Sequence, residues 1–319
     1  MNLKKSFIVV LIASLIFSVT IFAGCVKRVP EDPNTFTRTF LFDGLERTYR
    51  IHIPADISEN PSPALVFVLH GGGGTGEITE LSLTQGGFNK ISDEEKILVV
   101  YPDGINKHWN DGRFENETNQ ADDVGFLSAL TDSLIQEFDA DAQQVFFTGI
   151  SNGAMMSYRL AFDIPEKIAA IAPVAGSIPT VIMPDEISGH PISVCVISGT
   201  RDPLVPWEGG MAGTKNNPRG TVISGPDSVE YWVERNNCDK APESTNLPNT
   251  NLFDMCRVSQ DTYKNGDNGT EVVLYKITRG GHTWPGGTQY FPKIIIGRLC
   301  KDIDANTVIW DFFSKHPKR

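Results

Sequence analysis

Residues 145–162 read VFFTGISNGAMMSYRLAF, and the interpretation of the whole chain starts from this stretch. Its first residues are apolar, as in a strand covered on both faces, and residues 154–162 have the pattern of a helix. Between them, Gly149, Ser151 and Gly153 form a Gly-x-Ser-x-Gly sequence. A nucleophilic serine stands clear of a sheet on such a strand-to-helix turn, and the flanking glycines let neighbouring backbone come close. We therefore predict that Ser151 is a nucleophile at the carboxyl end of a strand.

Strands and helices alternate on both sides of this turn. Segments 36–42 and 46–53 alternate in polarity around Asp43 and Gly44, which predicts a hairpin. Further strands are predicted at residues 64–69, 97–101, 145–148, 168–174, 192–197 and 271–277, and helices at residues 122–138, 154–162, 227–235 and 304–313. This order predicts an α/β fold with a mainly parallel central sheet and helices on both faces. In such sheets functional residues gather at the carboxyl ends of the strands.

A serine hydroxyl is a weak nucleophile at neutral pH, so it needs an imidazole to accept its proton and a carboxylate to orient that imidazole. In hydrolases with this kind of turn the chain order is serine, acid, histidine. His282 lies in the sequence GGHTWPGG directly after the strand EVVLYKI, and Asp202 directly follows the strand ISVCVI. Two other histidines come after the serine. His190 precedes a strand, and His316 lies in the basic tail. We therefore predict a triad of Ser151, Asp202 and His282.

Acyl transfer also needs N–H donors for the oxyanion that develops on the substrate. The residue after the nucleophile and an early strand-to-helix loop usually supply them. Asn152 is the first predicted donor. Residues 70–74 read HGGGG after the strand ALVFVL, and Gly72 is the second predicted donor, with Gly73 as the next choice. A phosphate-binding loop would continue with Lys and then Ser or Thr, and this loop does not.

The composition fits one catalytic domain. The chain has 319 residues, of which 40% are hydrophobic, and this is enough to bury a core. Its net charge of −11 disfavours binding to nucleic acid, and scattered glycine and proline exclude collagen, coiled coils and repeat arrays. We predict a single catalytic domain over residues 36–319. No cofactor is expected, and no metal, because isolated His, Cys and Asp residues lack ligand spacing.

The first residues have the pattern of an export signal. A start with two lysines precedes an uncharged apolar run over residues 7–23, and small residues precede Cys25. A cysteine directly after Ala-Gly resembles the bacterial lipoprotein signal, in which that cysteine becomes the acylated first residue. We predict a signal peptide over residues 1–24, a lipid anchor on Cys25 and a tether over residues 25–35. The expected location is the bacterial cell envelope, periplasmic or at the cell surface; a cleaved, secreted protein and an uncleaved membrane anchor are the alternatives.

Export would permit disulfide bonds. Cys238 and Cys256 flank a loop rich in proline and asparagine, residues 241–253, and a bridge would close this loop. We therefore predict a disulfide between Cys238 and Cys256. Cys195 lies in a strand pattern and fits a buried thiol. Whether Cys300 is free or pairs with Cys195 stays open on sequence alone.

Eight segments occur in order from about residue 40 to residue 313, namely LHGGGG, YPDG…HWNDGR, DDVGF, GISNGAMMSYRLA, IAAIAPVAGS, SGTRDPLVPWEGG, GGHTWPGG and DIDANTVIWDFF. Together they resemble the polyhydroxybutyrate depolymerase and feruloyl esterase family of exported α/β-hydrolases. The resemblance implies the α/β-hydrolase fold and ester hydrolysis through an acyl-enzyme. It also implies that Ser151, Asp202 and His282 form the triad and that Gly72 and Asn152 bind the oxyanion. The implied substrates are esters of hydroxyacid polymers or oligomers, or feruloyl and acetyl esters on polysaccharide.

Three tryptophans near these residues are candidates for a substrate pocket. Trp109 follows the strand at residues 97–101, Trp207 comes five residues after Asp202, and Trp284 comes two after His282. Aromatic side chains close to the base can form an acyl or aryl pocket, although the same indoles can instead pack the loops. Two other functions stay open at this point. One is a serine peptidase of the same fold, and the other is a non-catalytic surface lipoprotein that binds glycan or polymer.

Overall fold

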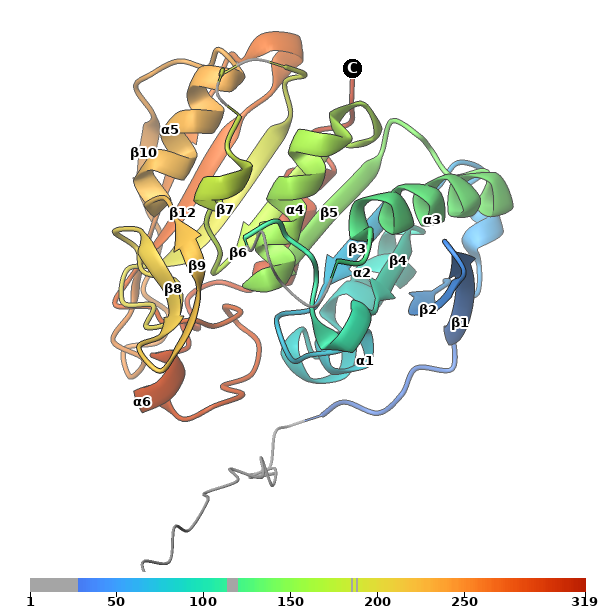
Figure 1. Cartoon of the computed structure of the whole chain (residues 1–319), viewed down its shortest axis with the longest axis horizontal. Helices are drawn as coiled ribbons and strands as arrows, with labels where there is room; N and C mark the ends of the chain where they lie inside the picture. The colour runs from blue at the N-terminus through green and yellow to red at the C-terminus, as the bar shows by residue number, and fades with distance from the viewer. Residues whose placement is uncertain (1–27, 114–119, 185, 188) are drawn as a thin grey trace, which may run out of the picture.

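A computed structural model describes residues 28–113, 120–184, 186–187 and 189–319 (Figure 1). The predicted signal peptide and Cys25 lie outside these residues. Within the described part of the chain, no helix has the length and apolar character that a bilayer crossing requires. The described end of the predicted tether already contacts the domain, because the Val29 N–H donates to the Leu81 carbonyl oxygen at 3.0 Å.

A central sheet of ten strands organises the molecule, in the order β1-β2-β4-β3-β5-β6-β7-β12-β11-β10. The strands are β1 (Thr35–Phe42), β2 (Leu45–His52), β3 (Leu65–Leu69), β4 (Leu98–Pro102), β5 (Val145–Ile150), β6 (Ala170–Val174), β7 (Ser193–Gly199), β10 (Glu243–Asn246), β11 (Arg257–Tyr263) and β12 (Val272–Thr278). The run from β4 to β12 is parallel, and antiparallel pairs extend it at both edges. The prediction of a mainly parallel sheet is confirmed.

Helices cover both faces of this sheet (Figure 1). They are α1 (Gly76–Ile78), α2 (Gly87–Glu95), α3 (Asp123–Phe138), α4 (Asn152–Asp163), α5 (Gly225–Arg235), α6 (Lys293–Ile296) and α7 (Ala305–Phe313). Side chains of α3, α4 and α5 join one core cluster, and those of α2 and α7 join the other. Single turns lie at Ile57–Glu59, Thr79–Leu83, Ile105–Lys107, Pro165–Lys167, Thr180–Ile182 and Asp267–Gly269.

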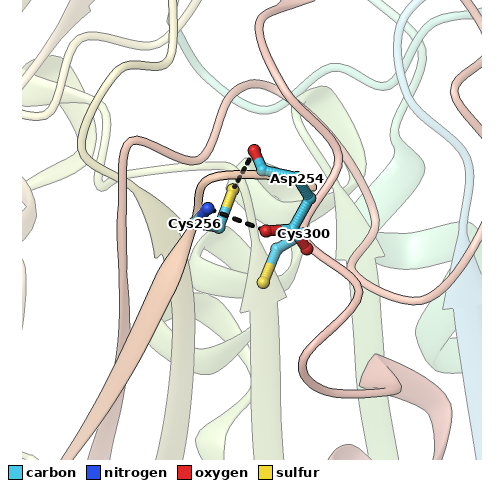
Figure 2. Close-up of side chains that lie close together, drawn as sticks. All are labelled: Asp254, Cys256 and Cys300. Atoms are coloured by element: carbon cyan, nitrogen blue, oxygen red, sulfur yellow. Dashed lines mark hydrogen bonds between the residues drawn. The ribbon is translucent and has the colours of Figure 1, made fainter. Parts of the chain in front are cut away.

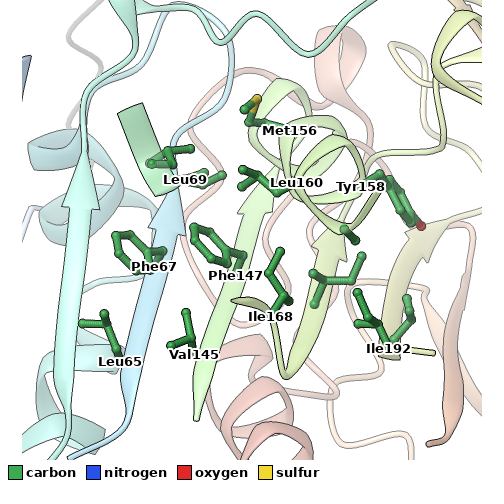
Figure 3. Close-up of a cluster of buried hydrophobic side chains, with 14 of the residues drawn as sticks. Leu65, Phe67, Leu69, Val145, Phe147, Met156, Tyr158, Leu160, Ile168 and Ile192 are labelled. Atoms are coloured by element: carbon green, nitrogen blue, oxygen red, sulfur yellow. The ribbon is translucent and has the colours of Figure 1, made fainter. Parts of the chain in front are cut away.

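The buried strands supply both core clusters with alternating side chains. In β3, Leu65, Phe67 and Leu69 face the cluster under α3, α4 and α5, and the residues between them face the other cluster. Figure 3 shows part of the core cluster under α3, α4 and α5. The rings of Phe67 and Phe147 stack there with their centroids 4.5 Å apart. Each fully buried side chain of this kind contributes about 2 kcal/mol to folding, so an unbroken apolar strand is strongly held between two helical layers.

The strands that the sequence did not predict lie outside the parallel centre of the main sheet. A separate two-stranded hairpin forms from β8 (Gly210–Thr214) and β9 (Asn217–Val222). At one edge of the main sheet, β10 occupies part of the predicted loop at residues 241–253, and β11 pairs with it. All four residues of β10 are exposed, so no hydrophobic alternation marks them as a strand.

The predicted disulfide between Cys238 and Cys256 is wrong. Cys238 belongs to the core cluster under α5, where its thiol donates to the Thr270 carbonyl oxygen at 3.9 Å. Cys256 belongs to the cluster on the opposite face of the sheet, where it lies beside Cys300. The sequence showed only that two cysteines flank a loop, and it held no information on which face of the sheet each thiol would enter.

Candidate active site

Ser151 lies on the turn between β5 and α4, and its backbone is strained. Its φ of 58° and ψ of −116° form a combination that non-glycine residues rarely adopt. The Ser151 N–H donates to the Val174 carbonyl oxygen, and the Ser151 carbonyl oxygen accepts from the Met155 N–H, each at 3.0 Å. These bonds to β6 and to the first turn of α4 hold the sharp strand-to-helix turn that a nucleophilic serine requires.

The two glycines of the Gly-x-Ser-x-Gly sequence are needed because this turn packs directly on β3. A Cβ atom on Gly149 would lie 2.7 Å from the Leu69 carbonyl oxygen. A Cβ atom on Gly153 would lie 2.5 Å from the same oxygen and 2.6 Å from the carbonyl oxygen of His70. Larger residues would therefore push the serine turn away from the loop that begins at His70.

His282 and Asp202 come together although 80 residues separate them in the chain. His282 Nδ1 lies 2.7 Å from Asp202 Oδ2, and both side chains are buried. The other oxygen, Oδ1, accepts the N–H groups of Leu204 at 2.7 Å and Val205 at 2.8 Å. Asp202 thus closes its own turn with one oxygen and presents the other to the imidazole, an arrangement that fixes the ring so that Nε2 can accept a proton.

A brace that the sequence did not reveal holds the His282 loop. The His282 N–H donates to the Ile296 carbonyl oxygen at 2.6 Å, and the Gly281 N–H donates to that of Arg298 at 2.9 Å. On the other side, the Tyr290 hydroxyl donates to the His282 carbonyl oxygen at 2.7 Å. The position of the imidazole therefore depends on the segment around residues 296–300.

Gly72 and Asn152 lie next to each other. A Cβ atom on Gly72 would lie 3.8 Å from Asn152 Cβ. Asn152 is the first residue of α4, so its N–H has no acceptor within the helix. Among the described residues the Gly72 N–H has no backbone acceptor, whereas the Gly73 N–H donates to the Lys107 carbonyl oxygen at 2.8 Å. Of the two glycines considered from sequence, Gly72 is therefore the one whose N–H can turn toward a ligand.

His70 holds this glycine-rich loop, and sequence reasoning had given it no role. Its Nε2 accepts the Gly104 N–H at 2.9 Å, so its Nδ1 carries the proton and donates to the Gly71 carbonyl oxygen at 2.8 Å. The Trp109 indole N–H donates to the His70 carbonyl oxygen at 3.0 Å. Burial lowers the pKa of His70 to about 4, so the ring is neutral near pH 7. A neutral ring preserves both of its hydrogen bonds.

The Asn152 side chain ties α4 to the loop after β4. Its Oδ1 accepts the Trp109 N–H at 2.8 Å, and its Nδ2 donates to Asp111 Oδ2 at 2.6 Å. Asp111 also pairs with Arg113 at 2.8 Å. A small polar cavity opens beside these residues, and it is lined by His108, Trp109, Asn110, Asp111, Gly112, Arg113, Asn152 and Arg219.

The cavity brings together residues from two separate parts of the chain. Arg219 comes from β9, and its Nη1 lies 3.5 Å from His108 Nε2. His108 in turn lies beside the glycine-rich loop at residues 70–74, because a Cβ atom on Gly72 would meet the His108 ring at 3.2 Å. The hairpin of β8 and β9, which sequence reasoning missed, therefore supplies a cation next to the candidate site.

Two of the three predicted pocket tryptophans belong to the core. The Trp284 ring is fully buried, and its indole N–H donates to Asn306 Oδ1 at 3.1 Å. Trp109 is 3% exposed and packs on His70, with ring centroids 4.8 Å apart. The prediction that the Trp284 indole binds substrate is wrong, because packing covers this ring completely, whereas Trp109 lines the small polar cavity and its role in substrate binding stays a prediction. Trp207 is half-buried beside Gly225 and Lys276, and its role stays a prediction.

Two groups of side chains in the described residues bring metal-ligand types within 4.8 Å of one another. One comprises Asp32, His52 and Asp93, where the His52 ring nitrogens lie 3.1 Å from Thr35 Oγ1 and 3.0 Å from Asp93 Oδ1. Hydrogen bonding accounts for this arrangement. The other comprises Asp254, Cys256 and Cys300 and is considered below.

Two solved structures illustrate the similarity of the fold. An acetyl xylan esterase from Aspergillus awamori superposes with a TM-score of 0.55 at 18% identity, and it covers 78% of this chain and 94% of its own. A structure titled sOPH superposes with a TM-score of 0.56 at 16% identity, over 91% of this chain and 89% of its own. These similarities show the α/β-hydrolase fold.

No protein-family model matches the chain. Proteins of similar sequence nevertheless identify its family. The protein named as esterase NocK of Nocardia uniformis subsp. tsuyamanensis is 30% identical over 91% of this chain and 86% of its own length. A probable feruloyl esterase C of Aspergillus niger is 29% identical over 75% and 82% of the two chains. Poly(3-hydroxyalkanoate) depolymerase C of Paucimonas lemoignei is 27% identical over 73% of this chain and 58% of its own. The chain therefore belongs to the polyhydroxybutyrate depolymerase and feruloyl esterase family, and it is an α/β-hydrolase that cleaves carboxylic esters.

Proposed function

We propose that Ser151, His282 and Asp202 form the catalytic triad of this esterase. The observation that carries the proposal is the 2.7 Å contact between His282 Nδ1 and Asp202 Oδ2. Both residues follow strands, β12 and β7, whose carboxyl ends face the same edge of the parallel sheet as the end of β5, where Ser151 lies. A carboxylate that orients an imidazole at this edge supplies the base that a serine hydroxyl needs.

In the proposed reaction the Ser151 hydroxyl attacks the ester carbonyl while His282 Nε2 takes its proton. The N–H groups of Gly72 and Asn152 bind the oxyanion, which lowers the energy of the tetrahedral intermediate. His282 then gives the proton to the leaving alcohol, and an acyl-enzyme remains on Ser151. Water, deprotonated by His282, attacks this acyl group, and the acid is released as the serine hydroxyl is restored.

Hydrolysis of p-nitrophenyl butyrate by Ser151→Ala tests this assignment. We expect a loss of about 10⁴-fold or more in kcat with an unchanged fold, because the nucleophile is removed. Ser157→Ala is the matched control, since Ser157 is a buried serine on the same helix whose hydroxyl donates to the Gly153 carbonyl oxygen at 3.0 Å. Equal turnover by wild type and Ser151→Ala would refute the triad.

We also propose that the natural substrates are short hydroxyacid esters with a free carboxylate. Support comes from Arg219, whose guanidinium lies on the cavity next to Asn152, while the nearby Asp111 is already paired with Arg113. A planar guanidinium suits a carboxylate, which the end of a hydroxyacid oligomer carries and a neutral acetyl ester does not. One relative is named a poly(3-hydroxyalkanoate) depolymerase, which agrees with this class.

A panel of hydroxybutyrate oligomers, methyl ferulate and acetylated xylan tests the substrate proposal. For Arg219→Ala we expect KM for the oligomers to rise about tenfold, with methyl ferulate little changed. Lys215→Ala is the matched control, because it removes a cation from the exposed turn of the same hairpin. An equal effect on all esters, or none on the oligomers, would contradict the proposal.

We further propose that the chain is exported and held at the cell envelope by acylation of Cys25. The support is the basic start, the apolar run over residues 7–23 and the small residues before the cysteine. Labelling of producing cells with radioactive palmitate tests this: wild type is expected to take up label and Cys25→Ala is not. Label in both, or in neither, would contradict a lipid anchor on Cys25.

A further inference from the structure

Two buried thiols lie together near the segment that braces the His282 loop (Figure 2). Cys256 directly precedes β11, and Cys300 lies between α6 and α7. Neither side chain is exposed, and their sulfur atoms lie within 4.8 Å of each other. The proposed ester hydrolysis uses neither thiol, so their proximity calls for another explanation.

The Asp254 carboxylate holds the two cysteine-bearing segments side by side. Its Oδ1 accepts the Cys256 N–H at 2.7 Å, and its Oδ2 accepts the Lys301 N–H at 2.8 Å. Nearby, Asp302 Oδ1 accepts the Thr250 N–H at 2.8 Å. A second carboxylate therefore links the segment before β11 to the segment that follows Cys300. These contacts fix the backbones on either side of the thiols before any bond joins them.

The two thiols differ in their readiness to ionise. A side-chain hydrogen bond between them lowers the pKa of Cys256 and raises that of Cys300. The thiolate is the form that attacks a disulfide. The hydrogen bond between the two side chains shows that the two sulfurs face each other in the fold.

We propose that Cys256 and Cys300 form a disulfide bond in the folded protein. The Cys256 thiolate attacks an external disulfide, such as oxidised glutathione, which forms a mixed disulfide and releases one thiolate. The Cys300 thiolate then attacks the Cys256 sulfur and releases the second. The pair loses two electrons and two protons, and the external disulfide becomes two thiols. Because both sulfurs are buried in the folded chain, this exchange takes place during folding.

The bond would secure the segment on which the His282 loop rests. The Gly286 N–H donates to the Cys300 carbonyl oxygen at 2.9 Å, and the neighbouring Arg298 carbonyl oxygen accepts the Gly281 N–H. A covalent link from Cys300 to the start of β11 would tie this segment to the sheet. The link closes a loop of more than 40 residues, which lowers the conformational entropy of the unfolded chain and so stabilises the fold.

A metal ion is the competing explanation for this cluster, and the donor set argues against it. Within the described residues the cluster offers three donors, Asp254, Cys256 and Cys300, whereas a structural zinc site normally uses four. Both Asp254 oxygens already accept backbone N–H groups. A bond between the sulfurs leaves these contacts intact.

Peptide mapping tests the proposal. The purified chain is unfolded with reductant, refolded in a glutathione redox buffer, and alkylated in denaturant before mass spectrometry. We expect a linked pair of peptides containing Cys256 and Cys300, with Cys195 and Cys238 alkylated. Reductant is expected to lower the melting temperature of wild type and of the control Cys238→Ser by about 5–10 °C, and to leave that of Cys300→Ser unchanged.

Three results would overturn the proposal. The first is alkylation of Cys195, Cys238, Cys256 and Cys300 in the refolded protein, the second is a bridge that contains Cys195 or Cys238, and the third is one tightly held zinc ion per chain together with free thiols. The peptide map of wild type alone decides the matter if Cys300→Ser does not fold. None of these measurements depends on ester hydrolysis, so the result is independent of the triad.

Discussion

The loops after β3 and β12 look alike in sequence and differ in what they do with their histidine. Each has a histidine next to a run of glycines, HGGGG and GGHTWPGG, and both histidines are almost fully buried. His70 bonds to two backbone groups, those of Gly71 and Gly104. His282 bonds through Nδ1 to the carboxylate of Asp202.

This difference separates a histidine that builds a loop from one that can carry a proton. Both ring nitrogens of His70 are engaged, and its burial without a carboxylate lowers its pKa to about 4. The carboxylate beside His282 stabilises an imidazolium, which is the species that forms when a base accepts the serine proton. Position after a strand and nearby glycines therefore do not identify a general base; the base also needs a carboxylate on one ring nitrogen and a position at the sheet edge where the serine turn lies.

The largest expected effect is that of His282→Ala. We expect kcat/KM for p-nitrophenyl butyrate to fall by about 10⁴- to 10⁶-fold, because the serine loses its base. His316→Ala is the matched control, since His316 is also buried and its Nε2 lies 3.3 Å from a Glu271 oxygen. Activity of this control within about twofold of wild type is expected. A comparable loss in both variants would show that activity falls when any buried histidine beside a carboxylate is removed, and that His282 has no special role as the base.

A smaller loss is expected for Asp202→Asn. The retained carbonyl oxygen can still accept the N–H groups of Leu204 and Val205, so the turn should persist. The new amide would place a donor opposite His282 Nδ1 and favour the wrong tautomer, which lowers kcat by about 10³- to 10⁴-fold. Assays of ester hydrolysis at several pH values measure this loss of kcat, with Asp304→Asn as the control. A variant with full activity would remove Asp202 from the triad.

The smallest effect concerns His70 and is one of stability. The pKa of His70 is about 4 in the folded protein and about 6.5 in the unfolded chain. Between pH 4 and pH 6.5 the unfolded chain therefore binds more protons at this residue than the folded protein does. The stability contribution of neutral His70 is complete above pH 6.5 and declines as the pH falls, by about 3 kcal/mol at pH 4. Urea unfolding of His70→Gln should lack this component of the pH dependence.

The free energies of unfolding of wild type and His70→Gln are compared over the same pH series, so that the contributions of other titrating groups cancel in the difference. Parallel curves would contradict the interpretation that His70 stays neutral as a structural group. The variant is also expected to keep most of its kcat, because the ring contacts the glycine-rich loop and not the proposed reacting atoms.

Much of the fold and the identity of the candidate residues followed from local patterns. Unbroken apolar runs such as 64–69 predict strands buried on both faces, and β3 is buried along its whole length. The Gly-x-Ser-x-Gly sequence predicts a strand-to-helix turn, and β5 and α4 flank Ser151. Asp202 and His282 could be proposed because they follow strands in the expected order.

What failed depended on contacts between distant segments. Trp284 comes two residues after His282, yet its indole bonds to Asn306 and is fully buried. The polar edge strand β10 has no hydrophobic alternation and was not predicted. The Cys238–Cys256 pairing failed because proximity along the chain does not determine the face of the sheet that a side chain enters.

By itself, the sequence determined the parallel sheet, the serine turn and the two histidine loops, since these depend on hydrophobic period and on glycines within a few residues. The tertiary structure alone decided that the His70 ring bonds to the backbone of Gly71 and Gly104, that Arg219 reaches His108, and that Cys256 lies beside Cys300. The physical reason is that backbone propensities act over a few residues, whereas hydrogen bonds and ion pairs join groups that only the packed sheet and its loops bring within reach.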